Sequence, residues 1–167
     1  MSAFRVPVQP VDATPAKRGI IRSGQAGGEE RMSEAEDLRA VAFHEAGHAI
    51  VARDFNLAIS EIEIGIDGDP TSGATKTDCT GHLSFIKQLA LCIAGTMAQE
   101  MFNAHAHAGV GRGDALRMAT LLDGLPKAEQ HLLRRAGYTR AHEILNFNKA
   151  DVERLAQRLM RDRRIGP

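Results

Sequence analysis

The amino-acid sequence predicts a mostly helical α+β domain, with a small β-sheet and a helical bundle at its C-terminal end. Apolar residues recur at helical spacing over 37–55 and 86–101, and again through the last third of the chain. Between the first two helices, residues 58–67 alternate apolar and polar side chains, which indicates a strand. A chain of 167 residues can bury one core but not comfortably two, so we expect one domain.

The composition is that of a globular protein and indicates neither a nucleic-acid nor a membrane partner. Apolar residues make up 43% of the chain, and 21 Lys and Arg balance 21 Asp and Glu. We therefore expect the basic stretches RRAGYTR (134–140) and RDRR (161–164) to be solvated helix faces. No apolar run approaches the roughly 20 residues of a membrane span, and no signal-peptide pattern is present.

The two cysteines, Cys79 and Cys92, make no disulfide framework and indicate a reducing compartment. Cys92 lies in LALCIAG, a stretch typical of a buried helix face, where a free thiol behaves as a small hydrophobic group. Together with the lack of a targeting signal, this predicts a cytoplasmic protein.

The first elements follow from the order of the patterns. Residues 1–32 are expected to form a flexible leader, because they combine prolines with SGQAGGEE and have no sustained periodicity. The folded domain, 33–167, is expected to begin at Ser33, because SEAE is a capping-box pattern. The helix that follows keeps apolar residues at helical spacing to about Phe55.

After this helix, AISEIEIGID (58–67) is the predicted strand. A loop rich in Gly, Thr, Asp and Pro is expected over 67–80, and TGHLSF (80–85) is expected to be a second short strand. The small residues Ala94 and Gly95 of the next helix would let another helix approach closely. Its apolar face comprises Ile86, Leu89, Ala90, Ile93, Ala94, Met97 and Met101.

The stretch NAHAHAGVGRG (103–113) breaks this long helix. A further helix is expected from about Asp114 to Asp123, followed by two more over 126–146 and 149–163. Asn148 is the expected N-cap of the last one.

The motif HEAGH, residues 44–48, lies in the middle of the first predicted helix. Residues four apart on a helix lie on the same side, so His44 and His48 can share one metal ion while Glu45 reaches a water bound to it. Zinc hydrolases use the HExxH spacing in this way, with the Glu as general base. Burying these groups without partners would cost on the order of several kcal/mol, and a bound Zn²⁺ removes that cost.

A catalytic zinc needs a third protein ligand and an open position for water. The residue types leave five candidates open. They are Asp114, which opens a helix, Glu100 in MAQEMF, and the loop residues His82, His105 and His107. The last two belong to HAHAG, whose alternate residues are expected to face solvent. His131 and His142 are expected at the surface.

Three motifs resemble, in order and approximate spacing, the protease domain of the membrane-anchored AAA+ zinc proteases of the FtsH type. They are HEAGHAIVA, LCIAGTMAQEMF and GVGRGDALRMATLL. The resemblance covers about residues 34–160. It implies a zinc metallopeptidase domain that hydrolyses peptide bonds.

The resemblance also implies roles for single residues. Asp114 would be the third zinc ligand beside His44 and His48, with Glu45 as the catalytic base. GHLSF would belong to the strand that pairs with an extended substrate. The substrate-binding residues implied in this way are Gly81, His82, Leu83 and Ser84.

The chain departs from this family as well. It contains no Walker P-loop and no transmembrane segments, Gly113 stands where the family has Asn, and MAQE replaces Ala–Glu–Glu. Without an unfolding motor, the expected substrates are peptides, exposed tails or already unfolded proteins, cleaved without ATP. A separate ATPase partner or a homo-oligomer fits this interpretation equally.

Two rival interpretations stay open. A small regulatory HExxH peptidase that cleaves a specific partner would use Glu100 as its third ligand. A non-catalytic zinc-binding module derived from such a protease would explain the missing motor, but it would not need Glu45, and structural zinc usually takes four protein ligands. Gly47 is expected to let the Asp114 helix or the metal come close, and Cys79 is a minor candidate near the zinc.

Overall fold

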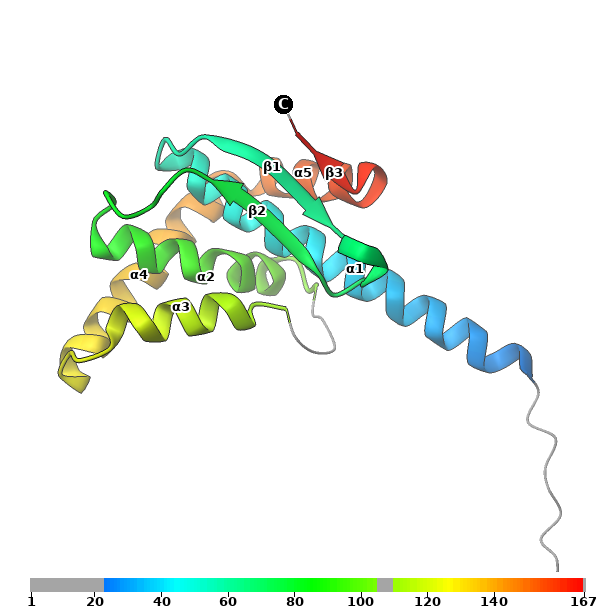
Figure 1. The fold of residues 1–167 in the computed structure, drawn as a ribbon, viewed down its shortest axis with the longest axis horizontal. Coiled ribbons are helices and arrows are strands. Elements are labelled where there is room, and N and C mark those ends of the chain that lie inside the picture. Colours follow the sequence, from blue (N-terminus) through cyan, green and yellow to red (C-terminus); the bar gives the residue numbers. More distant parts are fainter. Residues whose placement is uncertain (1–22, 105–109, 167) are drawn as a thin grey trace, which may run out of the picture.

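The computed structural model describes residues 23–104 and 110–166, with side chains from residue 33 onward. It is a mostly helical α+β domain, which confirms the predicted class (Figure 1). The helices are α1 (Ser23–Asp54), α2 (Phe85–Met101), α3 (Arg112–Leu122), α4 (Lys127–Phe147) and α5 (Lys149–Asp162). The strands are β1 (Ile59–Ile64), β2 (Gly73–Thr77) and β3 (Arg164–Ile165), and a short 3-10 helix, η1, spans Ile66–Gly68.

Helix α1 is at the centre of the fold, because every residue from Ala40 to Ala52 is buried except the half-buried His48. A helix of this kind is stable only when it is covered on all sides. The sheet lies over one side of α1, and α2, α4 and α5 pack around the rest (Figure 1). Val41 and Val51 are fully buried as a result. The HEAGH motif is therefore held in the core of the domain.

The sheet is antiparallel with the strand order β2-β1-β3. Ile62 of the central strand pairs with Thr75 of β2 and with Ile165 of β3. Ile62 and Ile64 are buried, and β1 packs on α1. Strand β2 is an edge strand, so one row of its backbone groups has no partner within the sheet.

The helical bundle at the C-terminal end is confirmed as well, with α4 and α5 close to their predicted bounds. Helix α4 approaches α2 closely at Gly137, where a Cβ would lie only 2.8 Å from Leu89 Cβ. Asn148 precedes α5 as expected, but its side chain donates to the carbonyl of Ile144 and makes no capping bond. His131 and His142 are exposed, as predicted, and so is the stretch 161–164, although α5 ends at Asp162 and Arg164 belongs to β3 rather than to a helix face.

Helix α1 begins earlier than the sequence predicted. It starts at Ser23, so the SEAE pattern expected to open it at Ser33 lies inside the helix. The residues before Ser33 include GEERM, in which Glu, Arg and Met are good helix formers, and this run overrides the local capping signal. The rest of the expected leader, residues 1–22, lies outside the described part of the chain.

The predicted position of the second strand is wrong. Residues 81–83 form turn and bend structure, Thr80 and Ser84 are irregular, and Phe85 already begins α2. The strand lies instead at 73–77, within the segment predicted to be a loop. Its sequence, GATKT, has no apolar alternation, and it is a strand because it pairs along β1.

Candidate metal centre

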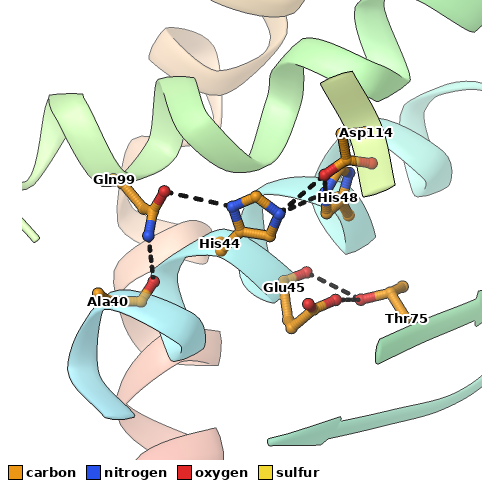
Figure 2. A network of polar contacts seen from close by, with 7 residues as sticks. All are labelled: Ala40, His44, Glu45, His48, Thr75, Gln99 and Asp114. Atoms are coloured by element: carbon orange, nitrogen blue, oxygen red, sulfur yellow. Dashed lines mark hydrogen bonds and ion pairs between the residues drawn. The ribbon is translucent and has the colours of Figure 1, made fainter. Parts of the chain in front are cut away.

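Three side chains from two helices meet at one point. His44 Nε2 lies 2.9 Å from Asp114 Oδ2, His48 Nε2 lies 3.0 Å from the same oxygen, and the two imidazole nitrogens are 3.0 Å apart (Figure 2). Ligand atoms about 2.0–2.2 Å from one tetrahedral ion are themselves roughly 3.4 Å apart. Two imidazole nitrogens and a carboxylate oxygen that converge in this way are the arrangement that a shared cation requires. The group can therefore hold a metal ion.

The two histidines are placed by the helical repeat of α1. His44 and His48 are one turn apart, and their rings meet edge to face with centroids 4.7 Å apart. His44 is buried and His48 is half-buried. The expected pairing of the two imidazoles on one side of the helix is confirmed.

Gln99 of α2 contacts the His44 ring at Nδ1, whereas Asp114 faces Nε2. Its Nε2 donates to the carbonyl of Ala40 at 3.1 Å, so its Oε1 faces His44 Nδ1, 3.3 Å away (Figure 2). An amide oxygen can only accept, so with a metal ion at Nε2 the neutral imidazole would carry its proton on Nδ1, facing Gln99. The lone pair of Nε2 is then directed toward the metal position, as in other metal sites with an oriented histidine.

Two glycines let α2 come close enough to make this contact. A Cβ on Gly95 would lie 2.4–2.6 Å from three ring atoms of His44. A Cβ on Gly47 would lie 2.5 Å from the carbonyl oxygen of Ala94. The sequence predicted a close approach at Gly47 but assigned it to the Asp114 helix or the metal, whereas the approaching helix is α2.

Asp114 is carried by the first turn of α3, as predicted. Gly111 precedes the helix with φ +83°, a left-handed conformation that turns the chain into it. Helix α3 packs on α2. Leu122 is its only buried residue, and the Asp114 side chain is 25% exposed.

The ionisation of these groups follows from their proximity. Burial disfavours the imidazolium of His48, but the hydrogen bond and charge of Asp114 outweigh it and raise the pKa of His48 above its ordinary 6.5. Burial would raise the pKa of Asp114, but hydrogen bonds from His44 and His48, together with their charges, hold it well below its usual range. A bound cation would take the place of the protons that now link His44 and His48 to Asp114.

Glu45 lies beside this group and against the sheet. The Thr75 hydroxyl lies 2.7 Å from Glu45 Oε2, to which it can donate, and 3.2 Å from the Glu45 carbonyl (Figure 2). A Cβ on Gly73 would lie 2.8 Å from Glu45 Oε1, so only a glycine lets β2 pass this close. The carboxylate is buried and its position is set by the edge strand.

A cleft of about 410 Å³ opens between β2 and α3, with His44, Glu45, His48 and Asp114 on its lining. Cys92 also lines it, and burial raises the pKa of this thiol to about 11, so the thiol stays protonated at neutral pH. The three ligand atoms and Glu45 are therefore reached through the same cleft.

The other predicted site residues fall elsewhere. Gly81, His82, Leu83 and Ser84 do not line the cleft and belong to no strand, so the basis for their substrate-binding role is lost. Glu100 is exposed and is not part of the metal group, and Gln99, one residue earlier, takes the supporting role beside His44. Cys79 is exposed and lies outside the metal group. His105 and His107 fall outside the described residues.

Comparisons with known proteins add no family assignment, since neither the known family models nor the curated proteins give a match to this chain. None of the described helices combines the length and apolar character needed to cross a membrane. The site must therefore be interpreted from its own geometry.

Proposed function

We propose that this chain is a zinc-dependent metallopeptidase that cleaves peptides or unfolded protein segments. The observation that carries the proposal is the convergence of His44, His48 and Asp114 at about 3 Å, with the Glu45 carboxylate on the same cleft. A site that only bound metal would need neither the open cleft nor a buried carboxylate beside it.

Zinc is the proposed ion because of the donor set. Two imidazole nitrogens and one carboxylate oxygen form a three-ligand site of the kind that catalytic zinc uses, with a fourth position left for water or substrate. Within the described residues no cysteine and no second carboxylate joins the group as a fourth ligand, which argues against a closed structural site.

The chain's own residues supply the proton transfers. His44, His48 and Asp114 would hold the zinc ion, which when bound would supply a nucleophilic water near neutral pH and polarise the scissile carbonyl. The carboxylate of Glu45 accepts the proton of the attacking water and passes it to the nitrogen of the departing amine. The Thr75 hydroxyl keeps Glu45 Oε2 in place meanwhile, since it lies 2.7 Å from that atom.

Strand β2, rather than residues 81–84, is the proposed support for the substrate backbone. It is an edge strand, and Gly73, Ala74, Thr75 and Thr77 all line the cleft. An extended peptide laid along this edge could pair with the unpaired backbone groups of β2 and bring one of its carbonyls to the metal position.

Cleavage of unfolded casein by the zinc-loaded protein tests this proposal. Glu45→Gln should retain zinc but lower the rate by about 100-fold or more, because it removes the general base. Glu153→Gln, an exposed position on α5, is the matched control and should leave the rate unchanged. Zinc binding with no cleavage by the wild type would favour a non-catalytic metal-binding module instead.

A further inference from the structure

The cleft also contains a feature that the proposed reaction does not use, namely two arginines on its α3 wall. Arg112 and Arg117 both line it, on either side of Asp114 in the sequence. We infer that they bind a carboxylate of the substrate, so that the enzyme prefers peptides with an acidic group close to the scissile bond. This inference names the substrate class of the proposed peptidase and therefore rests on that function.

Neither arginine has a carboxylate partner among the described residues. The guanidinium of Arg117 donates to the hydroxyl of Thr80, a neutral acceptor. Arg112 is exposed and makes no hydrogen bond or ion pair to another described residue. Elsewhere on the molecule, several arginines do pair with carboxylates. Arg112 and Arg117 are therefore two guanidinium groups on one cleft that no carboxylate of the described residues neutralises.

The acidic groups on the cleft lining are already engaged. Asp114 faces the two histidines, and Glu45 contacts the hydroxyl of Thr75. The opposite wall carries only neutral polar side chains. These are Thr71, Ser72, Thr75, Thr77 and Thr80. With a Zn²⁺ ion bound beside them, the charges of Asp114 and Glu45 would be balanced, and the two guanidinium groups would leave the cleft with positive charge, which attracts a carboxylate.

The position of Arg117 places this charge beside the reaction. It follows Asp114 by three residues on α3, so the two side chains lie on the same face, one turn apart. Its contact with Thr80 joins α3 to the segment that follows β2, and so spans the cleft. Guanidinium is suited to the role because its planar donors match a carboxylate in two parallel hydrogen bonds.

The carboxylate can come from two sources with the same chemistry. One is an Asp or Glu side chain within a few residues of the scissile bond, and the other is the α-carboxylate at the C-terminus of the substrate. Because Arg117 and Thr80 span the cleft, a substrate that ends there is as compatible with the geometry as one that continues.

Matched peptides separate these cases. One set has the same sequence with Glu or Gln at single positions around the cleaved bond, and the other has a free or an amidated C-terminus. In one of the two sets, we expect kcat/KM to be at least about tenfold higher for the peptide that carries the carboxylate. A charge-assisted hydrogen bond contributes about this factor. The preference should fall with added salt.

Arg112→Gln combined with Arg117→Gln should bring the ratio of kcat/KM for the acidic peptide to kcat/KM for its amide partner to within about twofold of one. Arg117→Lys should retain part of the preference. Arg135→Gln, exposed on α4 and outside the cleft, is the control and should keep the full preference. Equal cleavage of the acidic and amide peptides by the wild type would overturn the inference. So would a preference that persists in the double variant.

A binding measurement separates failure of this inference from failure of the proposed function. The zinc-loaded Glu45→Gln protein is titrated into the same peptides carrying a fluorophore, and anisotropy gives the dissociation constants. The carboxylate site is supported if the acidic peptides bind more tightly and if this difference is lost when Arg112→Gln and Arg117→Gln are added to Glu45→Gln. This holds even if no peptide is ever cleaved. Equal dissociation constants for the acidic and amide peptides would overturn it even if cleavage is efficient.

Discussion

The two sides of the metal group are built in opposite ways. His44 lies in the packed interface between α1 and α2, with its side chain 4% exposed, and Gln99 and Gly95 fit closely around its ring. Asp114 lies on α3, whose Leu116 is 71% exposed and whose only buried residue is Leu122. The first side is fixed by the same packing that stabilises the domain. The second reaches the site from a helix with little packing of its own.

This difference indicates what each side contributes. A ligand embedded in the core is preorganised before any metal binds, whereas a ligand on a lightly packed helix is held partly by its contacts with the other ligands. Metal binding should therefore stabilise the position of α3 much more than that of α1 and α2. Substitutions on the α1–α2 side should therefore lower the free energy of unfolding more than substitutions on α3.

The largest effect is expected for Gly95→Ala. Its Cβ would lie 2.4 Å from Cε1 of His44, whose ring is held at its two nitrogens by Gln99 and Asp114. The free energy of unfolding should fall by about 1–3 kcal/mol, and metal affinity should fall with it. Urea unfolding and a competition titration with a chelator measure the two effects.

Gly113→Ala on α3 is the matched control for this substitution. Nothing lies within 4 Å of the added Cβ, and alanine is the better helix former by about 1 kcal/mol. We expect unchanged or slightly higher stability and unchanged metal affinity. Equal damage from both substitutions would show that the two sides of the site do not differ in packing.

A smaller effect is expected for Gln99→Leu, which removes the acceptor for His44 Nδ1 and the donor to Ala40. Metal affinity should fall by about 10–100-fold, because the His44 ring loses the contact that orients it. Gln99→Glu keeps an acceptor beside Nδ1 and should retain more of the affinity. If both variants bind metal as tightly as the wild type, Gln99 does not orient the ligand.

The smallest effect is a pH dependence of the metal-free protein. The pKa of His48 is raised on folding, so its contribution to stability is complete below its ordinary 6.5 and is lost as pH rises through the folded value. The pKa of Asp114 is lowered, so its contribution is present above the ordinary 3.8 and is lost only in acid. Unfolding with chelator present should therefore require less urea at pH 8.5 than at pH 6.

Asp114→Asn removes the charge that raises the pKa of His48, so the decrease between pH 6 and pH 8.5 should disappear in this variant. The metal-loaded wild type should show the opposite trend, because a metal ion needs the neutral imidazole and binds more tightly as pH rises. A decrease of the same size in the variant and the wild type would assign it to other groups.

The sequence predicted the parts of the site that depend on local spacing. His44 and His48 follow from the helical repeat, and the helix that begins near Asp114 follows from the break before it. The placement of Asp114 at the metal was suggested by a resemblance rather than by spacing, and the geometry brings it there.

What the sequence did not predict depends on contacts between distant segments. GATKT is a strand through its pairing with β1, so its own composition misled. Gln99 and Thr75 lie 55 and 30 residues from the side chains that they support, and no local pattern links them. The small residues Ala94 and Gly95 did indicate a close approach, and the helix that they approach is α1, at His44 and Gly47.

The most direct test of the account is the zinc content of the wild type and of Asp114→Ala, purified in parallel and exchanged against a weak chelator. We expect one zinc per chain in the wild type and its loss or marked weakening in the variant, with α1 and α2 intact by hydrogen exchange. Wild-type protein that binds no zinc would contradict the central claim, and zinc retained at full affinity without Asp114 would contradict the assignment of the third ligand.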